Sequence, residues 1–191
     1  MKTATLGSDL SLAILGLLTI RPASGYGLRK TFRATAMRAF SASPGAVYPA
    51  LRRLREDGLI EGKVERPHAL RPREVFAPTR QGRRALVGAL AEPVTREDVV
   101  RRMDRLLLRF SFMTGLVGEA ETLAFLTRLA DETEKYHRDL ADEFRRSGPG
   151  LPFTGRAALE QGVESYRATA RWARKTLGEL RKRMPSKGAV R

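Results

Sequence analysis

The sequence predicts a mainly α-helical protein with an N-terminal winged helix-turn-helix domain and a C-terminal α-helical dimerisation domain. Three observations lead to this fold class. Residues 43–79 show the pattern of a helix, a strand, a basic loop, a second strand and the start of another helix. Positive charge is concentrated in residues 1–90. Apolar residues recur at three- and four-residue spacing through the second half, which is typical of packed helices.

The helix over residues 44–57 is the predicted recognition helix. Its apolar residues Val47, Leu51 and Leu54 are spaced by four and three positions and therefore share one face. The first turn and the outer face supply small residues followed by arginines, a pattern suited to close approach to DNA. These candidate DNA contacts are Ser43, Gly45, Ala46, Tyr48, Arg52 and Arg53. The spacing alone fits an ordinary amphipathic core helix equally well, so the choice depends on the residues that follow.

Those residues have the pattern of a wing. Leu59 and Ile60 begin an extended run, a turn between two prolines spans residues 67–72, and a second extended run covers residues 73–77. We expect three apolar side chains of the wing to face the core: Val64, Val75 and Ala77. We expect the basic side chains to face solvent or DNA and to meet phosphates: Lys63, Arg66, Arg71 and Arg73.

The remaining N-terminal segments predict three more helices. Ser8 or Asp9 caps a helix that ends at Ile20, with Leu10, Ile14, Leu17 and Leu18 as its buried stripe. Ser24 caps a second helix that runs to about Phe40. Its expected core residues are Tyr26, Leu28, Phe32 and Met37, with Arg29, Lys30 and Arg33 facing outward. Thr79 caps a fourth helix that runs to about Ala91.

These motifs resemble the PadR family of transcriptional regulators over residues 10–90. The matching segments are Leu15-Gly16-Leu17-Leu18, Gly25-Tyr26 with Leu28, Ser43 with Gly45, Tyr48-Pro49, Arg53-Leu54, Gly58-Leu59-Ile60, Arg71-Pro72-Arg73, and Thr79 with Gly82. The chain departs from the family pattern at Ser24, Leu70, Glu74 and Pro78. The resemblance implies a winged helix domain followed, in the longer branch of the family, by a helical dimerisation domain. It also implies that some relatives respond to phenolic acids or drug-like aromatic compounds.

The charge distribution favours nucleic acid as the partner. The chain has a net charge of +15; residues 1–90 hold 16 lysines and arginines against 6 acidic residues, a net charge of +10, whereas residues 91–173 hold 13 against 14. A positive domain beside a nearly neutral one is typical of DNA-binding proteins. The sequence has no cysteine, which excludes disulfides and thiol catalysis and fits a cytoplasmic location.

No catalytic or metal-binding pattern occurs in the sequence. It has no phosphate-binding glycine loop, no zinc-protease helix, no nucleophile elbow and no cluster of cysteine and histidine. The two histidines, His68 and His137, fall in different predicted domains. We therefore expect a protein that is not an enzyme and that needs no cofactor or metal.

The second half predicts a helical domain over residues 93–184 after a winged helix domain over residues 1–92, with a basic tail at 185–191. Thr95 caps a helix that runs to about Met113, and another helix spans 119–146. The last helix has a seam of apolar residues at alternating spacings of four and three. The candidate dimerisation residues in it are Leu159, Val163, Tyr166, Leu177 and Leu180. A bundle within one chain explains this seam as well as a dimer does.

The function expected from these features is sequence-specific binding of double-stranded DNA by a homodimeric regulator in the bacterial cytoplasm. We expect a repressor, and we expect a palindromic operator because a two-fold dimer reads two half-sites. Trp172 is the candidate to form the floor of a pocket for a small aromatic effector, although a packed core tryptophan is the more common case. The alternative is a basic nucleic-acid-binding protein without sequence preference.

Overall fold

The computed structural model describes residues 6–35, 37, 44–66 and 72–183. Ser43, Arg71 and the predicted basic tail at 185–191 lie outside the described residues. The chain divides into two compact units, Met1–Glu92 with Leu108–Phe112, and Pro93–Leu107 with Met113–Arg191. Each unit is described by itself below.

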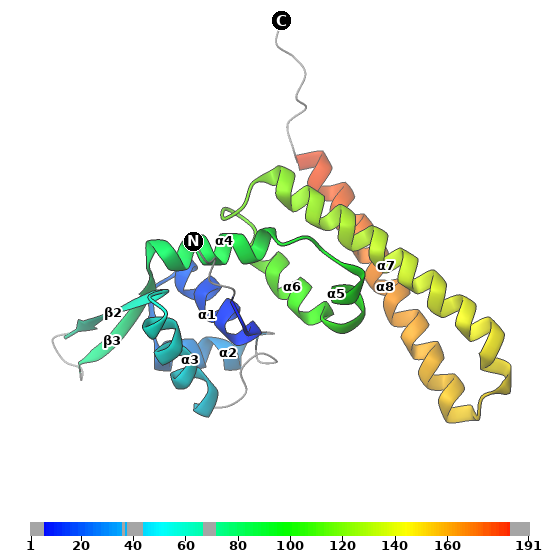
Figure 1. Ribbon diagram of the computed structural model, residues 1–191, viewed down its shortest axis with the longest axis horizontal. Helices are drawn as coiled ribbons and strands as arrows, with labels where there is room; N and C mark the ends of the chain where they lie inside the picture. The colour runs from blue at the N-terminus through cyan, green and yellow to red at the C-terminus, as the bar shows by residue number, and fades with distance from the viewer. Residues whose placement is uncertain (1–5, 36, 38–43, 67–71, 184–191) are drawn as a thin grey trace, which may run out of the picture. The chain divides into compact units, whose positions relative to one another are not determined.

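The first unit is a winged helix-turn-helix, as predicted. Its helices are α1 (Asp9–Ile20), α2 (Gly25–Ala34), α3 (Pro44–Glu56) and α4 (Arg80–Ala91). Its sheet has the order β1-β3-β2, formed by β1 (Ala23–Ser24), β2 (Ile60–Glu65) and β3 (Arg73–Pro78), and both pairings are antiparallel. The β2–β3 hairpin is the wing, and α3 leads directly into it (Figure 1).

Hydroxyl caps begin three of these helices. The side chains of Ser8, Ser24 and Thr79 accept hydrogen bonds from backbone N–H groups three residues on, at 3.2, 3.2 and 3.0 Å. A hydroxyl at this position satisfies one of the free N–H groups of the first turn. The caps predicted at Ser24 and Thr79 are therefore confirmed, and Ser8 rather than Asp9 caps α1.

The core of the first unit contains the residues that helical spacing selected. Val47, Leu51 and Leu54 of α3 are buried, as are Leu28 and Phe32 of α2. In α1 the buried set is wider than the predicted stripe: it comprises Leu12, Ala13, Ile14, Leu15, Gly16 and Leu18, while Leu10 and Leu17 are only half-buried. Burial around most of α1 explains why its sequence is apolar with little amphipathic pattern.

Two predictions for α2 are wrong. The helix ends at Ala34 rather than near Phe40, because Thr35 has an extended backbone with φ −128° and ψ 170°. Tyr26 does not lie in the core; its side chain is 71% exposed. Tyr26 lies two positions before Leu28, and two residues turn a helix through about 200°, so Tyr26 faces away from the buried side.

The residues on the core side of the wing differ from those predicted. Val64 is 58% exposed, Val75 and Ala77 are half-buried, and the buried residues of β3 are Phe76 and Pro78. The register pairs Ile60 with Pro78 and Gly62 with Phe76, so these residues share the inner face. Val64 is also on that face by alternation, but it lies toward the tip of the hairpin, where the burial along β2 has ended.

A glycine and an arginine attach the segment 108–112 to the first unit. A Cβ added at Gly16 of α1 would lie 2.6 Å from the ring of Phe112, so the ring packs directly on the helix backbone. Arg109 is buried and donates hydrogen bonds to the carbonyl oxygens of Leu90, at 3.1 Å, and Glu92. These carbonyls lie at the end of α4, where no intrahelical donor remains, so the guanidinium satisfies them.

The second unit is a helical hairpin preceded by one short helix and the first part of another, whose residues from Leu108 onward belong to the first unit. Its long helices α7 (Glu119–Ser147) and α8 (Phe153–Arg183) lie side by side and are joined through the short η2 (Gly148–Gly150) (Figure 1). The single helix predicted from Thr95 to Met113 is instead two helices, α5 (Arg96–Arg101) and α6 (Met103–Ser111). The break lies at Arg102, whose φ of −140° and ψ of 35° are not helical.

Within the described ranges, no helix is both long enough and apolar enough to cross a bilayer. Over the same ranges, no three side chains of histidine, cysteine, aspartate or glutamate gather as a metal site requires.

Candidate nucleic-acid interface

The outer face of α3 presents the residues that the sequence predicted for DNA contact. Gly45, Arg52 and Arg53 are exposed, Tyr48 is 48% exposed and Ala46 is half-buried. The opposite face is buried, so the helix has one free side. Small side chains at the start of this side and guanidinium groups one to two turns later leave room for a DNA groove and supply donors for base edges.

A depression of about 420 Å³ joins α3 to the start of α2 and to the wing. Its lining residues are Ser24, Gly25, Tyr26, Tyr48, Leu51, Arg52, Arg55, Arg73, Glu74 and Phe76. The depression thus brings together three of the predicted contacts, Tyr48, Arg52 and Arg73. The other predicted contacts that the structure describes do not line it. Two exposed tyrosines and the guanidinium group of Arg52 give this surface groups that can bind phosphate and base edges.

Gly25 explains how Tyr48 reaches this depression. A Cβ added at Gly25 would lie 2.7 Å from the ring atom Cε1 of Tyr48 and 3.3 Å from Leu51. Since side chains do not tolerate a contact of 2.7 Å, the tyrosine ring can occupy this place only over a glycine. The Gly25-Tyr26 and Tyr48-Pro49 motifs are therefore parts of one contact between α2 and α3.

Sequence reasoning placed Arg29, Lys30 and Arg33 on the outer face of α2 but did not select them as DNA contacts. Tyr26, Arg29, Lys30, Arg33 and Ala34 line a shallow depression of about 280 Å³. The signal was present, because residues 26, 29, 30 and 33 have the spacing i, i+3, i+4 and i+7 of a single helix face. In a helix-turn-helix, the helix before the recognition helix crosses the DNA backbone, so three basic residues on its outer face suit phosphate contact.

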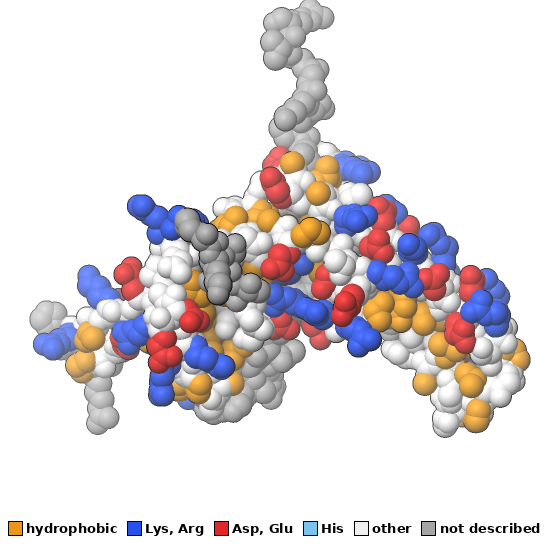
Figure 2. All heavy atoms as spheres, in the orientation of Figure 1, with side chains coloured by type: hydrophobic (Ala, Val, Ile, Leu, Met, Phe, Trp, Pro, Cys, Tyr) orange, Lys and Arg blue, Asp and Glu red, His pale blue; other side chains and the backbone are white. Residues whose placement is uncertain are grey.

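The wing carries both free and paired cations. Lys63 and Arg66 are exposed, and no carboxylate within the described part of the chain lies within ion-pair distance of either. Arg73 is different, because its Nη2 and Nε lie 3.1 and 3.3 Å from Oε2 of Glu65. Figure 2 shows acidic side chains beside the basic ones over the wing. Arg73 is thus placed where the sequence predicted, but an anion already binds it.

A second ion pair fixes the base of the wing to α3. Arg55, in the last turn of α3, pairs with Glu74 of β3. The guanidinium of Arg55 also lies over the ring of Phe76, with its carbon 5.6 Å from the ring centroid. Both interactions hold α3 and β3 at one relative position. Sequence reasoning did not select Arg55, because its partner is nineteen positions away.

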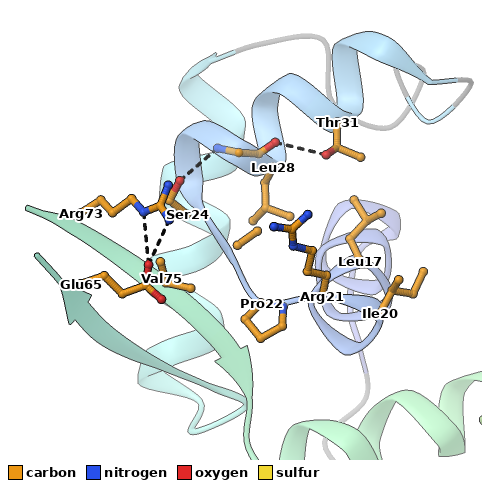
Figure 3. Close-up of a pocket in the computed structure, with 12 residues that line it drawn as sticks. Leu17, Ile20, Arg21, Pro22, Ser24, Leu28, Thr31, Glu65, Arg73 and Val75 are labelled. Atoms are coloured by element: carbon orange, nitrogen blue, oxygen red, sulfur yellow. Dashed lines mark hydrogen bonds and ion pairs between the residues drawn. The ribbon is translucent and has the colours of Figure 1, made fainter. Parts of the chain in front are cut away.

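A pocket of about 560 Å³ lies on another side of the wing (Figure 3). Its apolar lining comes from Leu17, Ile20, Pro22, Ala23, Leu28 and Val75. Figure 3 shows the side chain of Arg21 between the apolar residues of α1 and Pro22, and the Glu65–Arg73 pair at the opposite wall. Arg73 therefore borders two cavities, this pocket and the depression at Tyr48.

The candidate dimerisation residues differ in their burial within the chain. Leu177 is buried at 2% exposure, whereas Leu159, Val163 and Leu180 are half-buried. Tyr166 packs inside the second unit, since its ring contacts that of Tyr136 edge to face, with 4.6 Å between the ring centroids. Its hydroxyl donates to the carbonyl oxygen of Val99 at 3.2 Å. Leu177 and Tyr166 therefore have packing partners without a second chain, and Trp172 is 36% exposed.

Comparison with known proteins gives matches among solved structures. No curated protein sequence matches the chain. The crystal structure of Bacillus subtilis PadR in complex with operator DNA is 21% identical, with 90% of this chain and 98% of that chain covered and a TM-score of 0.42. A PadR-like transcriptional regulator from Bacillus cereus is 26% identical, with coverage of 92% and 99% and a TM-score of 0.40.

The sequence itself matches a family model over part of its length. Residues 14–87 match the transcriptional regulator PadR-like family. This range runs from the middle of α1, through α2, α3 and the wing, into α4. It includes most of the N-terminal motifs noted above and all the described residues of the candidate interface. Over residues 14–87 the chain is thus a match to the transcriptional regulator PadR-like family, which confirms the resemblance that its motifs indicated.

Proposed function

We propose that the protein is a transcriptional repressor that binds a palindromic DNA operator as a homodimer in the bacterial cytoplasm. Helix α3 enters the major groove and reads bases with Arg52 and Arg53. The basic face of α2 and the free cations of the wing contact the phosphate backbone. These roles correspond to those of the recognition helix, the preceding helix and the wing in DNA-binding winged helices.

One observation supports this proposal above the others. Tyr26 and Tyr48 are exposed large aromatic residues of the first unit, and both lie with Arg52 at the depression between α2, α3 and the wing. Tyrosine and arginine together are well suited to phosphate oxygens and base edges.

The experiment separates base reading from phosphate binding. A duplex selected by the wild-type protein from a random-sequence library serves as the operator, and a scrambled duplex serves as the reference. Arg52→Ala and Arg53→Ala should weaken operator binding more than scrambled binding, because a bidentate arginine–guanine pair discriminates by about 1–3 kcal/mol. Lys63→Ala should weaken both equally and should reduce the slope of log affinity against log salt by roughly one unit.

The outcomes distinguish the candidate functions. Equal losses on both duplexes for all three variants would mean that α3 does not read bases. A library from which no sequence is enriched would favour the non-specific alternative. If the wild-type affinity does not change with salt, DNA is not the partner of the basic domain, since every phosphate contact releases counterions.

The homodimer is proposed to form through the first half of α8. Leu159 and Val163 are only half-buried within the chain, and the nearby Phe153 is 75% exposed. Leu159 and Val163 begin the seam whose later members Tyr166 and Leu177 pack within the chain. The double variant Leu159→Asp with Val163→Asp should convert the dimer to a monomer in sedimentation equilibrium while its helix content is kept. Leu177→Asp should instead lose helix content, because Leu177 is buried in the single chain. A wild-type monomer at micromolar concentration would contradict the proposal.

A small aromatic effector, which would release the repressor from DNA, is proposed to bind near Trp172. About a third of the surface of this side chain is exposed, so a ligand can reach the indole. Trp172 is the sole tryptophan of the sequence, and its fluorescence therefore reports one place. A phenolic acid that quenches this fluorescence should also weaken DNA binding in the same concentration range. Quenching without an effect on DNA binding would contradict the effector role.

A further inference from the structure

The Glu65–Arg73 pair occupies the face of the wing that is proposed to meet DNA. The two residues are direct partners across the antiparallel ladder, next to the tip of the hairpin. One carboxylate oxygen of Glu65 receives two hydrogen bonds from the guanidinium, at 3.1 and 3.3 Å (Figure 3). Both side chains remain accessible, since 55% of Arg73 and 45% of Glu65 are exposed. The pair is therefore formed in water and can be opened by another anion.

The neighbouring Lys63 differs from Arg73 in having no ion-pair partner among the described residues. Lys63 lies on the same face of β2 as Glu65, because the two are separated by two positions. Lys63 has no carboxylate partner within the segments that the structure describes, and its own cross-strand neighbour is Val75. Of the two basic residues of the ladder itself, Lys63 is thus free to bind an anion, whereas Arg73 must first leave Glu65.

The Arg55–Glu74 pair has a different position and role. It connects α3 to β3, and its arginine also lies over Phe76. Removal of Glu74 would therefore change how the recognition helix is held against the wing. Glu65 joins only the two strands of the hairpin, so its charge can be removed with less effect on α3. A change in DNA affinity on replacement of Glu65 can therefore be attributed to the wing rather than to a shift of α3.

We propose that Glu65 competes with DNA phosphate for the guanidinium of Arg73, and that it thereby lowers the affinity of the wing for any duplex. The inference rests on the proposed DNA-binding function. While Arg73 is paired with Glu65, the carboxylate offsets its charge and uses its Nε and Nη2 donors; when the pair opens, the released carboxylate lies close to the negatively charged backbone. Both effects weaken binding, and neither depends on the base sequence. Glu65 is in this sense a built-in limit on non-specific binding.

The test compares two glutamate variants that change the net charge equally. Glu65→Gln releases Arg73. Glu61→Gln removes an exposed carboxylate from the same face of β2, and among the described residues Glu61 pairs with no arginine. Affinity for a random-sequence 24-base-pair duplex, a length chosen here for the assay, is measured by fluorescence anisotropy over a range of salt concentrations. Both variants should bind more tightly than wild type, because each removes one negative charge from a surface that meets DNA.

Glu65→Gln should exceed Glu61→Gln by roughly two- to five-fold in affinity, which is the range for one exposed ion pair. Its salt slope should be steeper by roughly one unit, because one more phosphate is neutralised. In an Arg73→Ala background, Glu65→Gln should gain no more than Glu61→Gln does. This third comparison shows whether the gain passes through Arg73 or only through charge.

Equal gains for the two glutamate variants would overturn the inference, and so would an extra gain for Glu65→Gln that persists without Arg73. In both cases salt-dependent binding by the wild type would leave the proposed function intact. If the wild type shows no salt-dependent binding to the duplex at all, the proposed function fails and the inference fails with it. Circular dichroism of each variant confirms that the fold is unchanged, so that affinity is compared between folded proteins.

Discussion

Replacement of Gly82 by alanine tests the most demanding contact in the winged helix. Gly82 lies in the first turn of α4, and a Cβ added there would lie 1.9 Å from the carbonyl oxygen of Leu59. That oxygen also accepts a hydrogen bond from the backbone N–H of Thr79 at 3.0 Å. The carbonyl cannot move aside as a flexible side chain could. The first turn of α4 must therefore shift away from the start of β2.

The size of the effect follows from two opposing contributions. Alanine is a better helix former than glycine, which stabilises by about 0.5–1 kcal/mol inside a helix. Overpacking of a tight interior contact costs about 1–3 kcal/mol, and a backbone clash of this depth is at the upper end. We expect Gly82→Ala to lower the free energy of unfolding by about 2–2.5 kcal/mol. Gly88 provides the matched control, because it lies in the same helix and, apart from its chain neighbours and the helix backbone, no atom of the described residues lies within 4 Å of an added Cβ.

Gly88→Ala should therefore raise the free energy of unfolding by about 0.5–1 kcal/mol. Urea unfolding of the full chain, followed by far-ultraviolet circular dichroism, measures both variants. For a chain of this length, 1 kcal/mol corresponds to a shift of about 2–4 °C in Tm, so thermal unfolding gives an independent check. A Gly82→Ala variant that is as stable as Gly88→Ala would show that the contact between α4 and Leu59 is not tight, and the reasoning would fail.

Three further predictions use other contacts. Gly25→Ala should displace the ring of Tyr48 and weaken DNA binding several-fold while the far-ultraviolet spectrum is unchanged; unchanged affinity would mean that Tyr48 is not a contact. Tyr166→Phe removes the hydrogen bond to Val99 and should cost about 0.5–1.5 kcal/mol in urea unfolding, and no loss would contradict its role. Arg174 holds the pKa of Glu134 below its ordinary value of 4.5 by a hydrogen bond, so the pair stabilises the fold above that pH and this stability is lost as the pH falls below it. Glu134→Gln should therefore reduce the fall of Tm between neutral and acidic pH, and an unreduced fall would refute it.

Much of the fold was predictable because it depends on local signals. The caps at Ser24 and Thr79 and the stripe of Val47, Leu51 and Leu54 lie within single helices, where a few neighbouring residues determine the structure. The winged helix-turn-helix class followed from the order of these signals. The break at Arg102 was not predictable in the same way, because the residues on both sides have good helix propensity and no glycine or proline marks the position.

The errors in the wing and in α2 have a common physical cause. Alternation shows which strand residues share a face, but only tertiary packing decides which face is covered and where the cover ends. Val64 is on the face of β2 that packs against the core, but it lies past the last buried residue of the strand and is therefore exposed. For Tyr26 the aromatic ring suggested burial, whereas its spacing from Leu28 placed it on the outer side. Periodicity was the better guide there, because a surface helix buries one stripe whatever the residue type.

The candidate site was predictable as a list of basic residues, but not as a set of interactions. The sequence selected Arg52, Arg53, Lys63 and Arg73 by charge and position, and all four are exposed. It could not distinguish Arg73 from Lys63, because the pairing of Arg73 with Glu65 depends on the register of the hairpin. Charge patterns identify a surface, whereas ion pairs across strands decide which of its cations can bind DNA.

The strongest sequence motifs mark positions that hold the domain together. Thr79 donates its hydroxyl hydrogen to the carbonyl of Gly58 at 2.7 Å, and its N–H binds the carbonyl of Leu59. The N–H of Leu59 in turn donates to the carbonyl of Leu54 at 2.8 Å, and the φ of Gly58 is 69°. The end of α3, the start of the wing and the start of α4 therefore meet at one joint. This joint fixes the direction of α3 relative to the wing. An outward arginine of α3 can therefore be replaced without a change in the joint. Under the proposed function, sequence preference is thus separable from the motifs of the joint and is carried by exposed residues such as Arg52.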